Sequence, residues 1–171
     1  MPSALTLTLI YWLHLLATIL WLGGLTAQGL LVLPAARSAL DDVAYAALLG
    51  KLRPRMQSLG WFCLALLGVT GLFQMSASPH YEGFLAITNA WSVAIFAKHI
   101  AVGGMLLLAG FETWGLMPAL QRQALRIAAG QTLAPEQLLP LRRQERTLLT
   151  LNLVLAAIVL LLTAYARASA S

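Results

Sequence analysis

Apolar residues fill four long stretches of the chain, and polar residues gather in the segments between them. The stretches cover residues 5–33, 58–75, 91–116 and 148–165. A transmembrane helix needs about 20 consecutive apolar residues, a length that the second stretch only just reaches. The pattern predicts an all-α fold, a polytopic four-helix membrane bundle built as a single domain over residues 1–171. We find no repeat of a whole unit in the sequence.

Composition agrees with a membrane protein. Of the 171 residues 60% are hydrophobic and only 10% are charged, and soluble domains do not reach these values. The net charge of +5 comes from basic residues in short loops, so it does not indicate a nucleic-acid partner. The single cysteine, Cys63, excludes an intrachain disulfide.

Charge along the chain predicts the topology. Nine of the eleven basic residues lie in two alternate loops, residues 34–57 and 117–147, and the middle loop 76–90 has none. Basic loops stay on the cytoplasmic side of a membrane. We therefore expect both termini and the middle loop on the outer, periplasmic side.

Turn and capping signals predict how the first basic loop is built. Pro34 lacks an amide hydrogen, so it is expected to end the first membrane helix. Residues 43–52 then read as a separate short amphipathic helix at the cytoplasmic interface. In the second basic loop, Gly130 is expected to close a helix that begins near residue 119.

Two histidines stand at the same predicted depth in the first and third membrane helices. His14 shares one helix face with Thr18, Trp21 and Gln28, and a histidine inside a membrane is a functional candidate by default. By helical rise, His14 and His99 both lie about 12–14 Å below the outer interface. Two neutral imidazoles at one depth can ligate the iron of haem b axially. The alternative is that each histidine is a hydrogen-bonded structural group.

Other polar residues of the spans extend this hypothesis. Lys98 points about 100° away from His99 on the same helix, so it cannot share that residue's direction. Lys98 and Gln28 are candidates for contacts around the cofactor or for a quinone site. Glu112 lies near the cytoplasmic end of its helix, either as a rim carboxylate or as part of a proton relay.

The outer loop offers a different metal chemistry. Met75 and His80 flank a short polar turn, and thioether and imidazole groups suit Cu(I). An incidental loop is the competing interpretation, because two ligands without a third make a poor copper site.

Several motifs resemble the copper resistance D (CopD) domain, a four-helix membrane module. They are WLHLLATILWLGG followed by LLVLP, then LRPRMQSLGWFCLALLGVTGLF, AKHIAVGGMLLL and NLVLAAIVLLLTAYA, and they cover nearly the whole chain. The resemblance implies a multi-pass protein of the bacterial inner membrane that is associated with copper uptake. The module is also distantly similar to HemJ-type protoporphyrinogen oxidases, which bind haem b. Their helix-one histidine and helix-three lysine match His14 and Lys98.

Three functions follow. The first is a haem-b membrane protein of electron transfer, or a haem-dependent oxidoreductase, with His14 and His99 on the iron. The second is copper transport or copper resistance through Met75 and His80. The third is a non-catalytic accessory subunit. The expected partners are the lipid bilayer, a quinone or a redox protein, and a larger membrane complex or a homo-oligomer.

The topology can be tested by labelling single cysteines introduced after His80 and after Ala129. An impermeant thiol reagent applied to intact cells should label the first position and not the second. The reverse pattern would invert the bundle in the membrane.

Overall fold

Four helical rods make up the fold. The structure is a computed structural model and describes residues 3–83, 87–131 and 135–169. The first rod consists of α1 (Ala4–Ala27), a π-helical segment η1 (Gln28–Val32) and α2 (Leu33–Ala39), and the second is α3 (Asp42–Ser76). The third consists of α4 (Ala90–Phe111), the π-helical segment η2 (Glu112–Leu116) and α5 (Met117–Ala128), and the fourth is α6 (Pro135–Ala168). The described residues contain four helices long and apolar enough to cross a membrane, which confirms the predicted fold class.

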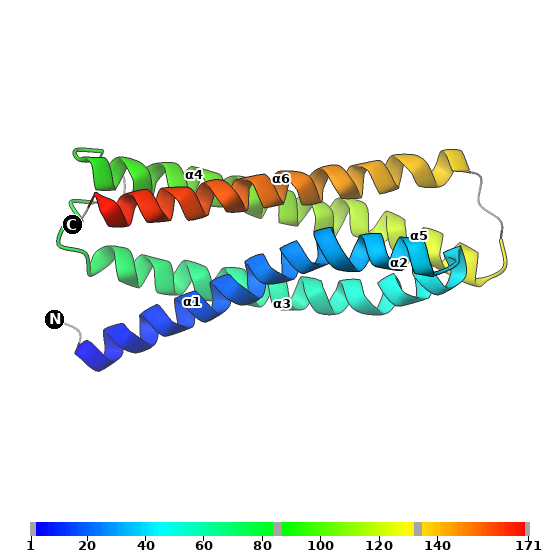
Figure 1. Cartoon of the computed structure of the whole chain (residues 1–171), viewed down its shortest axis with the longest axis horizontal. Coiled ribbons are helices and arrows are strands. Elements are labelled where there is room, and N and C mark those ends of the chain that lie inside the picture. Colours follow the sequence, from blue (N-terminus) through cyan, green and yellow to red (C-terminus); the bar gives the residue numbers. More distant parts are fainter. Residues whose placement is uncertain (1–2, 84–86, 132–134, 170–171) are drawn as a thin grey trace.

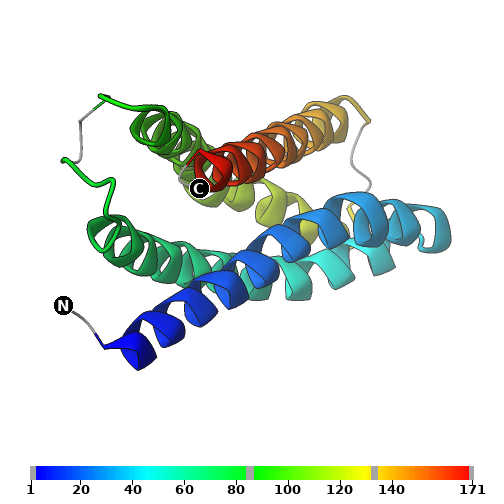
Figure 2. The same ribbon diagram turned by 60° about the vertical axis from the view of Figure 1, so that its left-hand side comes forward.

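The rods form two pairs. α1 packs along α3, and α4 packs along α6 (Figure 1). The start of α1, the start of α4 and the end of α6 lie at one end of the bundle, here called the termini end. The opposite end, where α2 is followed by α3 and α5 by α6, is called the basic end. Toward the termini end α3 and α4 diverge, whereas α5 packs on α3 near the basic end (Figure 2).

The buried apolar clusters lie toward the basic end. One joins Leu33 and Ala36 to Tyr45 and Leu49. The other consists of Leu116, Leu120 and Leu148. Most large apolar side chains elsewhere are exposed on the outside of the bundle, as lipid-facing residues are.

A buried ion-pair cluster also ties the basic end together. The Arg53 guanidinium of α3 donates to the Glu145 carboxylate of α6, and only 9% and 6% of these residues are exposed. Arg37 of α2 approaches the same carboxylate at 3.7 Å and donates from Nε to the Tyr45 hydroxyl at 3.1 Å. Three helices therefore depend on one carboxylate.

Pro34 does not end the first helix, and that prediction was wrong. The chain passes from α1 through η1 into α2, with Pro34 in the first turn of α2. A proline ring clashes with the carbonyl four residues earlier, which here belongs to Leu30 inside η1. The wider π turn absorbs this clash, and the Leu33 amide donates to the Gln28 carbonyl five residues back.

The separate interfacial helix at residues 43–52 is also absent, because these residues are the first turns of α3. Asp41 caps α3 by accepting a hydrogen bond from the Ala44 amide at 2.8 Å. After α5, Gly130 takes a left-handed φ of 77°, in agreement with its predicted role at a helix end.

The two halves of the chain share one arrangement of helices, although their sequences show no repeat. In each half, a helix leads through a five-residue π segment into a shorter helix and then into a long helix, α3 or α6. Gln28 begins η1 six residues before Pro34, and Glu112 begins η2 six residues before Pro118. Because α1 and α4 start at the same end, the halves are parallel repeats. When Gln28 is aligned with Glu112, most of the aligned residues in the two halves differ, so the repeat is not visible in the sequence.

Removing the Glu145 carboxylate should weaken the basic end strongly. Glu145→Ala leaves the Arg53 charge buried without its partner, which costs about 3–5 kcal/mol. Thermal unfolding in detergent should show this loss. Arg53→Met combined with Glu145→Leu should recover most of it, and Glu136→Ala on the exposed start of α6 should change little. Equal stability of Glu145→Ala and the native protein would contradict the role of the cluster.

Candidate functional site

His14 is held in one tautomer by α3. Its Nδ1 lies 2.8 Å from the hydroxyl of Thr70, a residue with 4% exposure. That hydroxyl donates its own hydrogen to the Leu66 carbonyl at 2.6 Å, so it accepts from His14. Nδ1 therefore carries the proton, and Nε2 of the neutral ring carries the lone pair.

The His14 ring also lies close to α3 at Gly71. A Cβ atom added at Gly71 would lie 3.5 Å from His14 Cε1. The ring therefore packs directly against the turn of α3 that also supplies Thr70. Together the two contacts fix both the position and the orientation of the imidazole.

His99 adopts the same tautomer by a different route. Its Nδ1 lies 2.7 Å from the carbonyl oxygen of Ile95, one turn earlier in α4. A carbonyl oxygen only accepts, so Nδ1 donates, and in a neutral ring the lone pair is then on Nε2. Histidine ligands of metals commonly donate from their second ring nitrogen in this way.

The two histidines lie at similar heights on diagonal rods. His14 is ten residues from the start of α1 and His99 nine residues from the start of α4, which places them about 15 and 14 Å along their helices. Both helices start at the termini end. They lie in the part of the bundle where α3 and α4 diverge, away from the buried apolar clusters.

Lys98 is the residue that the structural repeat matches to His14. Each lies fourteen residues before the start of its π segment, at Gln28 and Glu112 respectively. The repeat thus sets an amine in the second half at the position where the first half has an imidazole.

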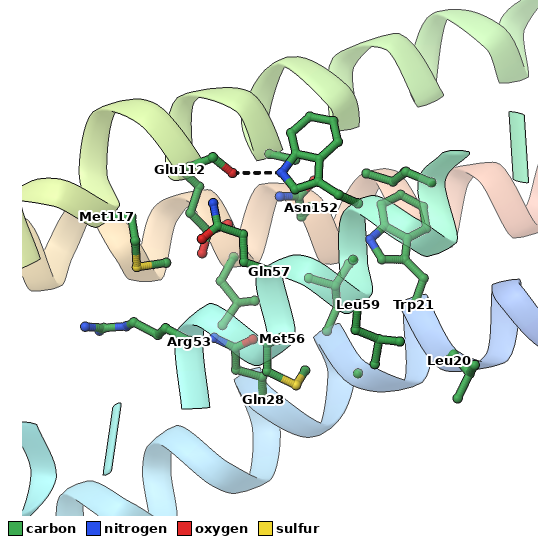
Figure 3. A pocket seen from close by; sticks show the side chains of 18 residues that line it. Leu20, Trp21, Gln28, Arg53, Met56, Gln57, Leu59, Glu112, Met117 and Asn152 are labelled. Carbon is green, nitrogen blue, oxygen red and sulfur yellow. Dashed lines mark hydrogen bonds between the residues drawn. The ribbon is translucent and has the colours of Figure 1, made fainter. Parts of the chain in front are cut away.

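Gln28 lies apart from the histidines. It is fourteen residues, about 21 Å along the helix axis, from His14. It lines a cavity toward the basic end together with Trp21, Glu112 and Asn152. Figure 3 shows this second polar site, whose Asn152 and Arg53 the sequence analysis did not single out. For Arg53, the available signal in the sequence was its charge, which is opposite to that of Glu145; both residues lie near a predicted membrane boundary.

The outer residues Met75 and His80 occupy different surroundings. Met75 is buried at the end of α3 with 8% exposure. The His80 ring lies near Trp91, with 6.0 Å between ring centroids. Within the described ranges, no group of three or more His, Cys, Asp or Glu side chains is arranged to hold a metal ion.

Fold and side chains define a four-helix integral membrane protein with two histidines toward the termini end and a polar cavity toward the basic end. Residues 50–166 match the sequence profile of a known family, described as CopD, Copper resistance protein D. The chain belongs to the CopD family. The match includes Lys98, His99, Met75 and His80, whereas His14 and Gln28 precede it. No curated protein and no solved structure gives a significant match. The similarity to HemJ-type protoporphyrinogen oxidases stays a prediction.

Proposed function

We propose that this CopD-family protein binds haem b near the termini end of the bundle and takes part in electron transfer in the bacterial inner membrane. The observation that supports this most is the shared tautomer of His14 and His99. In both rings Nδ1 is engaged as a donor and the lone pair is on Nε2, the nitrogen that axial imidazoles use. Haem b, when bound, supplies one-electron redox chemistry.

His14 is the first ligand in this proposal, and Thr70 is its positioning residue. The Thr70 hydroxyl holds the ring in the ligating tautomer, and the ring lies close to α3 at Gly71. Loss of such an outer contact commonly costs 10–100-fold in metal affinity. Thr70 should therefore matter to cofactor retention although it touches no iron.

His99 is the proposed second ligand, and Lys98 is its competitor. His99 is favoured by its Nδ1 hydrogen bond to the backbone. Lys98 is favoured by its match to His14 in the repeat. The two cannot serve together, because neighbouring residues of a helix point about 100° apart.

Visible spectroscopy of protein purified from haem-replete cells tests this proposal. The reduced protein should show sharp b-type bands, and His14→Ala should abolish or shift them, because losing an axial imidazole changes the spin state of the iron. His99→Ala should do the same. Thr70→Val should keep the bands but release haem about 10–100-fold more readily to a haem acceptor.

The variants also separate the ligands. Unchanged bands in His99→Ala together with altered bands in Lys98→Met would assign the second position to Lys98. His80→Ala is the matched control, since this histidine lies in the outer loop and should leave the spectrum unaltered. A colourless native protein would contradict the haem proposal as a whole.

Copper handling is the second candidate, and the family description favours it. In that function Met75 and His80 would capture Cu(I) outside the membrane, and His14 would receive it. Two soft ligands without a third form a weak Cu(I) site, so we rank this candidate second.

The double variant Met75→Leu, His80→Ala distinguishes the two candidates. We expect it to leave Cu(I) binding, measured by competition with a chromophoric chelator, almost unchanged. Met75→Leu alone controls for loss of packing at this buried position. A clear fall in stoichiometric Cu(I) binding by the double variant would place copper handling first.

A further inference from the structure

The cavity between the two halves of the bundle is a built polar site. All four rods line it, and its polar side chains include Gln28 from the first, Gln57 from the second, Glu112 from the third and Asn152 from the fourth. In Figure 3 the side chains of Gln57 and Glu112 point toward one another, and Asn152 lies beside them. Polar groups from separate helices thus converge on one space inside a membrane protein.

Asn152 indicates that this space has an occupant. It is 3% exposed and lines the cavity, and its side-chain oxygen has no hydrogen-bond partner in the described part of the chain. An unsatisfied buried acceptor costs about 1–3 kcal/mol. A donor inside the cavity would remove this cost.

The volume of the cavity selects water as that donor. The cavity measures about 80 Å³. A dry cavity of about 150 Å³ accommodates a benzene ring in another protein, and one water needs about 10–15 Å³. The space is therefore small for an aromatic ring and sufficient for several waters, and its amides and carboxyl supply their hydrogen bonds.

The cavity begins near the basic end and extends toward the middle of the bundle. Glu112 lies 22 residues, about 33 Å, from the start of α4, close to the thickness of the hydrocarbon core. From Gln28 the lining continues along α1 to Leu20, about 12 Å deeper. The inner limit, Leu20, is six residues, about 9 Å, from His14 along the same helix.

The surroundings of Glu112 contain an excess of positive charge. Arg53 from α3 and Arg37 from α2 share the single carboxylate of Glu145 from α6, and the Arg142 guanidinium lies 5.8 Å from the centre of the Tyr45 ring. Glu112 forms no ion pair within the described ranges and lines the cavity together with Arg53. As a carboxylate Glu112 reduces this excess of positive charge, and as an acid it leaves the excess in place.

The backbone marks the same two residues. Gln28 and Glu112 begin the π segments of the two halves, and both side chains line the cavity. π-helical turns occur frequently at functional sites, because they redirect a side chain without ending the helix. Here they bring a neutral and an acidic group from equivalent positions to one space.

We propose that this cavity is a hydrated inlet from the basic end and that Glu112 is its proton-exchange group. The Glu112 carboxyl releases its proton to a cavity water and recovers one from the same water, with no electron transferred. Asn152 accepts a hydrogen bond from that water, and Gln28 and Gln57 complete its surroundings. This proposal does not depend on whether the histidines toward the termini end bind haem or copper.

Infrared spectroscopy of the full chain in lipid nanodiscs tests the proton-exchange group. Acidification should produce a carboxyl C=O band that shifts when H₂O is replaced by D₂O. Glu112→Gln should remove this band, and Glu112→Asp should move it. Glu82→Gln, in the outer loop, is the matched control and should leave it in place.

Single cysteines test the hydration separately. Asn152→Cys lies on the cavity and Leu151→Cys, one residue away on α6, faces outward with 45% exposure of the native side chain. In membranes, Ag⁺ should modify Asn152→Cys at least severalfold faster, because thiols react as thiolates and ionise in water. Both variants are made in the Cys63→Ala background, so that the introduced cysteine is the one thiol in the protein. The native thiol that this change removes is fully buried.

Two results would overturn the proposal. The first is a carboxyl band that Glu112→Gln leaves intact or that D₂O does not shift. The second is equal modification of the two α6 cysteines. A native protein without haem would leave both measurements unaffected, so failure of the haem proposal and failure of the inlet are distinguishable.

Discussion

The absence of water in the bilayer core is the constraint on which the rest of this structure depends. Every backbone amide and carbonyl in the membrane must find a partner within the protein. The first and third rods continue through Pro34 and Pro118 with π turns, which keep the backbone hydrogen bonds of each rod within the helix. The same constraint makes a buried polar side chain costly, so the residues that remain polar inside the bundle identify its two sites.

The two ends of the bundle meet this constraint differently. At the basic end apolar clusters and the Arg53–Glu145 pair hold the rods together. Toward the other end α3 and α4 diverge (Figure 2), and the polar residues of the spans there include His14, His99 and Lys98. The basic end thus carries the polar cavity, and the histidines lie toward the termini end.

Hydropathy was sufficient to predict the four spans, because a run of about 20 apolar residues has few alternatives. It could not predict their ends. The rule that proline stops a helix does not hold at Pro34, which follows a π segment and lies in the first turn of α2, where a proline is tolerated. His14 and Lys98 were identifiable from the sequence as costly residues in a membrane. The Arg53–Glu145 pair and the partnerless Asn152 oxygen depend on contacts between distant helices, which no local pattern encodes.

The repeated arrangement of the two halves makes the centre of the bundle asymmetric. Two identical copies of one half, assembled as a dimer, would present the same side chain twice at each level. In this single chain an imidazole is opposed by an ammonium at one level, and an amide by a carboxyl at the other. At the first level both halves carry a basic group, whereas at the second level only the second half carries an acidic one. The second half therefore holds an amine and a carboxyl at different heights, which separates opposite charges along its length in a way that the first half does not.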